Sequence, residues 1–264
     1  MAATDALTGA SEEFVEVVGE KIRCLQSGSG DPLIVLHHDI GNPGWLPFYE
    51  QLAQRFTVTV PDFPGWGQSE RPVWMRSVRD LAVELNLLLD QSGIEQATLV
   101  GLGFGGWVAA EMATMNQSRC SRLVLVGATG LQPAEGEILD QFLHAHMDYV
   151  KMGFHDVANF HGVYGEEPPT EQLMDWDVHR EMVARIAWKP YLFSQTLPHL
   201  LPGLKTPTLV VWGSDDRIVP RNCGELYRDA LPNGRLEVIE GAGHFVEMEK
   251  PDDLSQLVLD FAGA

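Results

Sequence analysis

The sequence has few cysteines and few basic residues, and it lacks a long apolar run. Its three cysteines, Cys24, Cys120 and Cys223, form no C-x-x-C pair, so neither a disulfide framework nor a zinc site is indicated. Lys and Arg number 18 against 37 Asp and Glu, and the formal net charge of -19 argues against binding to nucleic acid. The same charge argues against an anionic membrane surface.

Targeting signals are also missing from the sequence. Residues 1–14 have no basic start followed by an apolar centre, and no apolar stretch has the length needed to cross a bilayer. We therefore expect a cytoplasmic protein that meets no membrane and no nucleic acid.

Short apolar runs alternate with helical patterns along the 264 residues. The runs in residues 97–101, 122–128 and 207–213 are nearly continuous in Val, Leu and Ile, as in parallel strands buried on both faces. Residues 77–93 and 251–262 have helical patterns. The alternation predicts an α/β fold, a doubly wound, mostly parallel sheet with helices on both faces.

The alternation stops between residues 131 and 204. This stretch has no convincing strand and carries helical patterns at 136–153 and 170–188. A helical insertion between core strands predicts a cap over the carboxyl ends of the strands, where open α/β sheets bind ligands. The expected division is a core of residues 1–130 and 205–264 with a cap of residues 131–204.

The glycine-rich stretch "GLGFGG" has two incompatible interpretations. Gly101, Gly103 and Gly106 have the G-x-G-x-x-G spacing of a dinucleotide-binding loop. Such a loop should be followed about 20 residues later by an acid that holds the ribose. The next apolar run, residues 122–130, ends without one, so no cofactor is expected. The other interpretation is the strand-to-helix turn G-x-S-x-G of a hydrolase, with glycine in place of serine.

Two later loops favour the hydrolase interpretation. "WGSDDRIVP" follows the apolar run at 207–213, and "GAGHFVEMEKP" follows the one at 235–240. The order elbow, acid, histidine is that of a hydrolase with three catalytic loops at one sheet edge. Taken together, these loops resemble the α/β-hydrolase superfamily over nearly the whole chain.

The resemblance implies a role for each loop residue. Asp216 falls at the acid position and His244 at the base position, with Asp215 as the fallback acid. The carboxylate would accept the Nδ1 proton of the imidazole and leave Nε2 free to take a proton from a reactant. Position 103 would carry the nucleophile, but Gly103 has no side chain that could attack a carbonyl.

The loop "HHDIGNPGW" departs from the pattern as well. His38 stands where the family commonly has glycine, so the shape of the oxyanion hole is expected to differ. The expected hole and pocket residues are Phe104 and Asp39 or Ile40, through backbone N–H groups, and His38.

Side-chain alternation beyond the strand would place His37 and Asp39 on one side and His38 on the other. His38 or Asp39 is then a candidate second ionisable group near His244, against an alternative of hydrogen bonds that only brace the loop. No metal site is expected, because the His-His-Asp run has no accompanying ligand cluster. Neither Ser69 nor Ser214 is a persuasive nucleophile.

Several hypotheses remain open. The first is an enzyme that acts on a small, partly apolar carbonyl substrate by ester or C–C bond hydrolysis. Gly103 then either replaces a nucleophilic serine in an inactivated hydrolase or is native, with Asp216 and His244 acting as a general base. The second is an inactive small-molecule-binding protein. C–C hydrolysis is included because residues 188–213 look like those of C–C hydrolases. Oligomeric state is not indicated.

Overall fold

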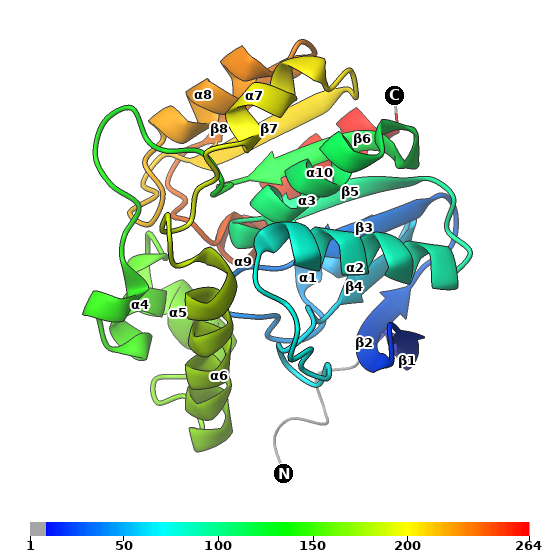
Figure 1. The fold of residues 1–264 in the computed structure, drawn as a ribbon. Helices are drawn as coiled ribbons and strands as arrows, with labels where there is room; N and C mark the ends of the chain where they lie inside the picture. Colours follow the sequence, from blue (N-terminus) through cyan, green and yellow to red (C-terminus); the bar gives the residue numbers. More distant parts are fainter. Residues whose placement is uncertain (1–8, 264) are drawn as a thin grey trace.

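The computed structural model describes residues 9–263 and contains one eight-stranded sheet with helices on both faces (Figure 1). The strand order is β1-β2-β4-β3-β5-β6-β7-β8. Strand β2 is antiparallel to β1 and β4, and all other neighbours are parallel, as the sequence predicts. The strands are β1 Ser11–Val17, β2 Glu20–Ser27, β3 Pro32–Leu36, β4 Thr57–Pro61, β5 Ala97–Leu102, β6 Cys120–Val126, β7 Thr208–Gly213 and β8 Gly234–Ile239.

Different helices cover the two faces of the sheet. Residues of α2, α3 and α8 belong to one large apolar cluster, and residues of α1, α9 and α10 belong to a second. Strand residues alternate between the clusters: Leu99 packs in the first and Val100 in the second. The α-helices are α1 Pro47–Leu52, α2 Val78–Gln91, α3 Phe104–Met115, α4 His146–Met152, α5 Val157–Tyr164, α6 Thr170–Ala187, α7 Leu197–Leu200, α8 Asn222–Ala230, α9 Val246–Glu249 and α10 Pro251–Ala262.

A single residue, Gly103, joins β5 to α3. Its φ of 52° lies in the left-handed region that glycine adopts at little cost. The neighbouring glycines are required for close packing: a Cβ at Gly101 would lie 2.4 Å from the Gly105 carbonyl oxygen, and one at Gly106 would lie 2.5 Å from Cβ of Ala128. The G-x-G-x-x-G spacing therefore has a packing explanation that needs no nucleotide.

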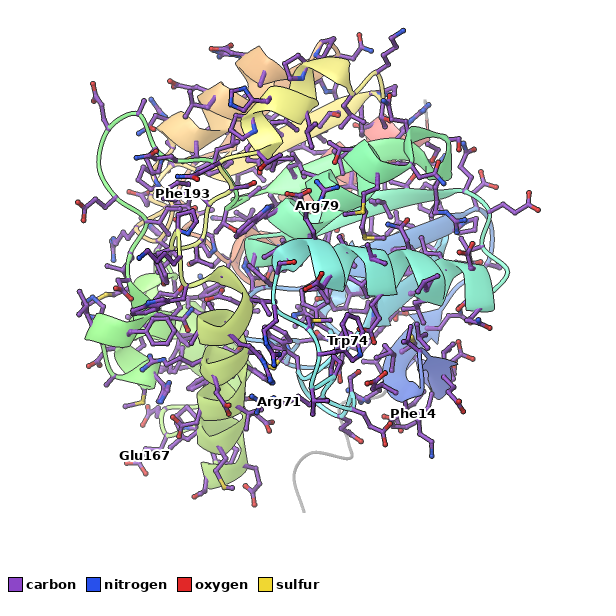
Figure 2. All side chains as sticks on the ribbon, in the orientation of Figure 1. Phe14, Arg71, Trp74, Arg79, Glu167 and Phe193 are labelled. Atoms are coloured by element: carbon purple, nitrogen blue, oxygen red, sulfur yellow. The ribbon has the colours of Figure 1, made fainter. Side chains whose placement is uncertain are left out.

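The stretch between β6 and β7 is helical, apart from an isolated bridge between Gly130 and Phe193. Figure 1 shows α4, α5 and α6 together beyond one edge of the sheet, whereas α7 lies against the helices of the core and contacts α3. Figure 2 marks Phe193 on the returning chain and Arg71 beside α6, where the Arg71 guanidinium pairs with Glu181. The division into cap and core stays a prediction.

The prediction of one helix is wrong over about half of its length. The pattern at residues 136–153 predicts a helix, but the α-helix there begins only at His146. The backbone N–H of Leu139 donates to the carbonyl of Ile218 at 2.8 Å, and that of Gln141 donates to the Tyr191 hydroxyl at 2.9 Å. These tertiary hydrogen bonds replace helical ones. Within residues 9–263, no helix has the length and apolar character needed to span a membrane.

Candidate active site

Four strands of the parallel part of the sheet deliver the predicted site residues to one edge. His38 follows β3, Gly103 follows β5, Asp216 follows β7 and His244 follows β8. The carboxyl ends of parallel strands lie at the same edge, which explains how residues far apart in sequence converge.

His244 and Asp216 form a buried pair. Oδ2 of Asp216 lies 2.8 Å from Nδ1 of His244, and both side chains are at most 1% exposed. A carboxylate can only accept, so Nδ1 carries the proton and donates it. The other carboxylate oxygen, Oδ1, accepts from the backbone N–H groups of Ile218 and Val219, each at 2.9 Å. Nε2 of His244 is left without a hydrogen bond.

Asp215, the fallback acid, points elsewhere. Its Oδ2 accepts from the Ser214 hydroxyl at 2.8 Å and lies 3.1 Å from Nδ1 of His155. Its side chain is 42% exposed, so it interacts mainly with solvent and with His155. The geometry therefore selects Asp216 over Asp215 as the partner of His244.

Opposing effects act on the charge of His244. Burial disfavours the imidazolium, but the charge and hydrogen bond of Asp216, with the charges of Asp39 and Glu247, outweigh it. The pKa of His244 is therefore raised above the ordinary 6.5. A base with this pKa is neutral, and able to take a proton, only on the alkaline side of that raised value.

His38 occupies the space in which a nucleophile would stand. A Cβ atom at position 103 would lie 2.2 Å from Nδ1 of His38 and 2.8 Å from Nε2 of His244. Real Cβ atoms essentially never approach other atoms this closely. Gly103 and His38, the two departures from the hydrolase pattern, are therefore complementary: the missing side chain of one makes room for the imidazole of the other.

Glu247 was missed by the sequence reasoning. It lies on the short helix α9, three residues after His244, and it is fully buried. Its Oε1 is 3.1 Å from Nε2 of His38, within ion-pair distance but without the geometry of a hydrogen bond. The only signal in the sequence is the three-residue spacing from the histidine, which is too common to identify a site.

The loop after β3 does not continue the alternation of the strand. Strand β3 ends at Leu36, and His37 turns to accept a hydrogen bond from the Phe63 N–H at 2.9 Å while its Nδ1 donates to the His38 carbonyl at 2.7 Å. Burial lowers the pKa of His37 to about 3, so its ring is neutral. His37 braces the loop, and the expected side shared by His37 and Asp39 stays a prediction, because β3 ends at Leu36.

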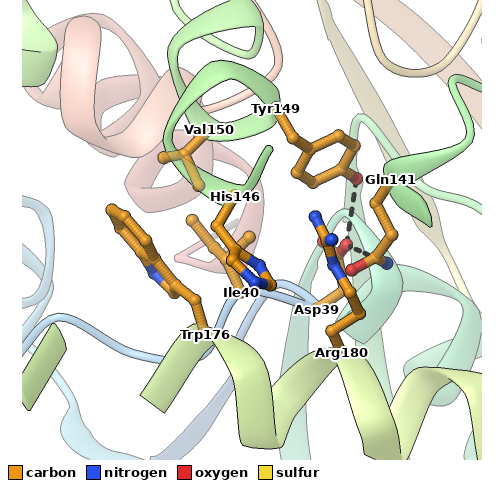
Figure 3. Close-up of a pocket in the computed structure, with 8 residues that line it drawn as sticks. All are labelled: Asp39, Ile40, Gln141, His146, Tyr149, Val150, Trp176 and Arg180. Carbon is orange, nitrogen blue, oxygen red and sulfur yellow. Dashed lines mark hydrogen bonds between the residues drawn. The ribbon is translucent and has the colours of Figure 1, made fainter. Parts of the chain in front are cut away.

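Asp39 lines a small pocket beneath the helical segment (Figure 3). Its Oδ2 accepts from the Tyr149 hydroxyl at 2.9 Å and from the Gln141 amide at 3.0 Å. Buried donors of Trp176 (Nε1) and Arg180 (Nε), which also line the pocket, have no hydrogen-bond partner. The free space inside the pocket is about 10 Å³, room for about one water molecule, and the lining also includes Ile40, His146 and Val150.

The predicted oxyanion groups are held firmly. Phe104 opens α3, and the first N–H groups of a helix have no partner within it. The Asp39 carbonyl accepts from Nε1 of Trp66 at 2.9 Å, and the Ile40 carbonyl accepts from Nδ1 of His179 at 2.8 Å. The first bond orients a predicted donor, because the Asp39 carbonyl shares its peptide unit with the Ile40 N–H. The second orients the unit that carries the Gly41 N–H, which itself donates to the His38 carbonyl at 3.0 Å.

The two alternative serines have backbone partners of their own. Ser69 donates to the Asp62 carbonyl at 2.8 Å and accepts from the Arg23 N–H at 3.0 Å. Ser214 accepts from the Gly241 N–H at 2.9 Å. Among residues 9–263, no group of three or more His, Cys, Asp or Glu is placed to hold a metal ion.

Glu249 fixes the loop that carries His244, and its replacement tests this support. One carboxylate oxygen accepts from the N–H groups of Gly243 (2.6 Å) and His155 (3.0 Å), and the other accepts from the Asp156 N–H (3.0 Å) and the Asn159 amide (3.1 Å). In Glu249→Gln, the side-chain NH2 group would replace one carboxylate oxygen and would face two N–H donors that need an acceptor. We expect the free energy of unfolding in urea to fall by about 2–4 kcal/mol.

The exposed Glu240 provides a matched control for this prediction. Glu240→Gln removes the same charge a few residues away and should change the free energy of unfolding by less than about 0.5 kcal/mol. Equal, small effects of both variants would mean that the four contacts of Glu249 contribute little to stability.

Comparisons with known proteins place this geometry in context. A model described as the alpha/beta hydrolase family matches residues 34–257. The 2-hydroxy-6-oxononadienedioate/2-hydroxy-6-oxononatrienedioate hydrolase of Paraburkholderia phymatum is 32% identical, over 98% of this chain and 99% of its own. The 2-hydroxy-6-oxo-6-phenylhexa-2,4-dienoate hydrolase of Comamonas testosteroni is 30% identical, over 98% of each chain.

Solved structures match over the same extent. The 2-hydroxy-6-oxo-6-phenylhexa-2,4-dienoate hydrolase of Rhodococcus sp. strain RHA1 has a TM-score of 0.78 at 22% identity, over 97% of this chain and 99% of that one. This likeness concerns the fold.

Proposed function

The chain belongs to the alpha/beta hydrolase family, and from this premise we propose that it is a hydrolase of the C–C bond type, with His244 as a general base in place of a nucleophilic side chain. The substrate is a small, partly apolar carbonyl compound. The relatives named above support this class, because their names describe 2-hydroxy-6-oxo dienoates and they are similar to nearly the whole of this chain.

One observation carries the proposal: the unbonded Nε2 of His244 faces Gly103, while Asp216 holds Nδ1. Glycine cannot form an acyl intermediate, so the base must act on water. His244 takes a proton from water, the hydroxide forms a bond to the carbonyl carbon, and the carbonyl electron pair moves onto oxygen. The N–H of Phe104 is the expected donor to that oxyanion.

The substrate would enter beneath the helices α4 to α6, which in this proposal act as the cap. The lining there combines apolar walls with unpartnered donors of Trp176 and Arg180, which suit an oxygen-rich, partly apolar compound. Because the free space is only about 10 Å³ and its lining does not include His244, the proposal requires α4 to α6 to move apart when substrate binds.

Turnover of a substrate panel tests the proposal. The panel contains 2-hydroxy-6-oxo-6-phenylhexa-2,4-dienoate and short-chain p-nitrophenyl esters, assayed with the unmodified protein and with His244→Ala. We expect the dienoate to be cleaved without an initial burst of product, and His244→Ala to lower kcat by roughly 10³-fold or more. A burst of one equivalent per site would reveal a covalent intermediate and contradict the mechanism.

An inactive binding protein is the second candidate. It is favoured by the burial of both imidazoles, each 1% exposed, with His38 filling the space above Gly103. Saturable binding of the dienoate without turnover, unchanged by His244→Ala, would support it over hydrolysis.

A further inference from the structure

We propose that His38, backed by Glu247, is a second acid–base residue of this site and returns the proton that completes bond cleavage. The inference rests on the proposed function, in which His244 is the base, and it adds the acid that the mechanism needs once no nucleophile is present.

The two imidazoles converge on one point. Nδ1 of His38 and Nε2 of His244 are both directed at position 103, at 2.2 and 2.8 Å from the place of a Cβ atom there. The ring centroids are 4.9 Å apart, and neither nitrogen has a hydrogen bond. Buried polar nitrogens are nearly always bonded, so two unbonded ones facing the same small volume indicate a place for a reactant or water.

Glu247 lies against His38 as Asp216 lies against His244, but at ion-pair distance and without a hydrogen bond. Both oxygens of the Glu247 carboxylate are buried and without a hydrogen bond. A buried carboxylate is costly unless a cation or a proton donor compensates it. Among the described residues, the ion-pair partner of Glu247 is His38, at 3.1 Å from Nε2. The proton on Nε2 then faces Glu247, and Nδ1 is the nitrogen that exchanges a proton with the site.

The remaining groups around His38 do not compete for this proton. The ring of Phe245 packs edge-on at 4.7 Å and is apolar. His37, the preceding residue, is neutral and bonded at both nitrogens. Asp39 is turned to Tyr149 and Gln141. The charged and titratable groups that face His38 are therefore Glu247 and His244, with Asp216 behind the latter.

The proton balance closes with two histidines. After water has given one proton to His244 and hydroxide has added to the carbonyl carbon, the tetrahedral intermediate collapses. The C–C bond breaks, its electron pair goes to the leaving carbon, and that carbon takes the Nδ1 proton of His38, which in this proposal starts the cycle as an imidazolium with its other proton on Nε2. Transfer of the first proton from His244 to His38 restores the starting state. The net change is addition of water, with no oxidant, reductant or further reactant.

His38→Ala distinguishes a catalytic acid from a side chain that merely blocks the site, because the two roles predict opposite changes in kcat. As the acid, His38 contributes roughly 10²- to 10⁴-fold, so His38→Ala should lower kcat for dienoate cleavage by at least about 100-fold with little change in KM. A rise in kcat would identify a block and overturn the proposal.

Controls distinguish the role of Glu247 from a structural one. Glu247→Gln keeps the shape of the side chain, and it should lower kcat less than His38→Ala while displacing the limb of the pH profile that belongs to His38. His199→Ala replaces an exposed histidine on α7 and should change neither. A Glu247→Gln variant that lowers only the melting temperature, with an unchanged pH profile, would contradict the assignment.

A measurement without substrate separates failure of this inference from failure of the proposed function. Side-chain ¹⁵N NMR of the histidines, recorded in the unmodified protein, Glu247→Gln and His244→Ala, follows the protonation of His38 directly. We expect the signals of His38 to show a proton on Nε2, and both substitutions to change these signals. A ring that stays neutral throughout would overturn the inference even if the dienoate is cleaved.

Discussion

Gly103→Ser alone is expected to give no acyl-enzyme, whereas the triple variant Gly103→Ser/His38→Gly/Glu247→Gln is expected to become a serine esterase. The reason is the overlap at position 103, where the new Cβ would lie 2.2 Å from Nδ1 of His38. His38→Gly opens the space, and Glu247→Gln avoids leaving a buried carboxylate without its imidazole.

The expected changes differ in kind between the two variants. The single substitution should lower the free energy of unfolding by about 1–3 kcal/mol through overpacking. The triple variant should raise hydrolysis of a p-nitrophenyl ester by roughly 10²- to 10³-fold over the unmodified protein, a small part of the roughly 10⁶-fold that nucleophile and base supply together in a mature hydrolase.

Pre-steady-state kinetics provide the measurement. The triple variant should release a burst of p-nitrophenol close to one equivalent per site, and the same variant with His244→Ala should not. A full burst in Gly103→Ser alone would mean that His38 moves aside at little cost, and that the site is a serine hydrolase that has lost one side chain.

Much of the fold could be predicted from the sequence because the strands carry a direct physical signature. Every residue of β5 and β7 is buried, and both strands have nearly continuous apolar sequences. Asp216 and His244 were accessible to prediction for a related reason: each lies in the loop after a parallel strand, β7 or β8, and parallel strands bring their carboxyl ends to one edge.

The features that the sequence did not reveal depend on tertiary contacts. The alternation rule holds only while the strand lasts, so it could not place His38 above Gly103 after β3 ends at Leu36. The expected helix at residues 136–145 lost its backbone donors to Ile218 and Tyr191. Glu247 carries no local signal, because its burial is set by helix α9 packing towards a loop some 200 residues earlier in the chain.

Asp216→Asn is expected to lower kcat/KM by roughly 10³- to 10⁴-fold at alkaline pH, because the amide can present its NH2 to Nδ1 and favour the wrong tautomer. Asp215→Asn is a matched control, since it makes the same change one residue earlier. Its carboxylate faces Ser214 and His155, so activity should stay within about twofold.

The pH dependence of kcat/KM provides a second, independent test of this prediction. In the unmodified protein the pKa of His244 is raised, so the limb of the kcat/KM profile that belongs to His244 should rise with pH up to that raised value, separately from the limb that belongs to His38. Burial alone acts in the opposite direction, and Asp216→Asn removes the charge and the accepting oxygen that oppose it, so the pKa of His244 should fall in this variant. The ratio of kcat/KM between the unmodified protein and Asp216→Asn should therefore fall about tenfold for each pH unit below the pKa of His244 in the unmodified protein. In that range His244 of the unmodified protein is protonated and cannot act as a base, whereas His244 of the variant is still neutral. A ratio of kcat/KM that stays constant across pH would mean that Asp216 orients the imidazole of His244 without raising its pKa. The base that acts in turnover would then be another group.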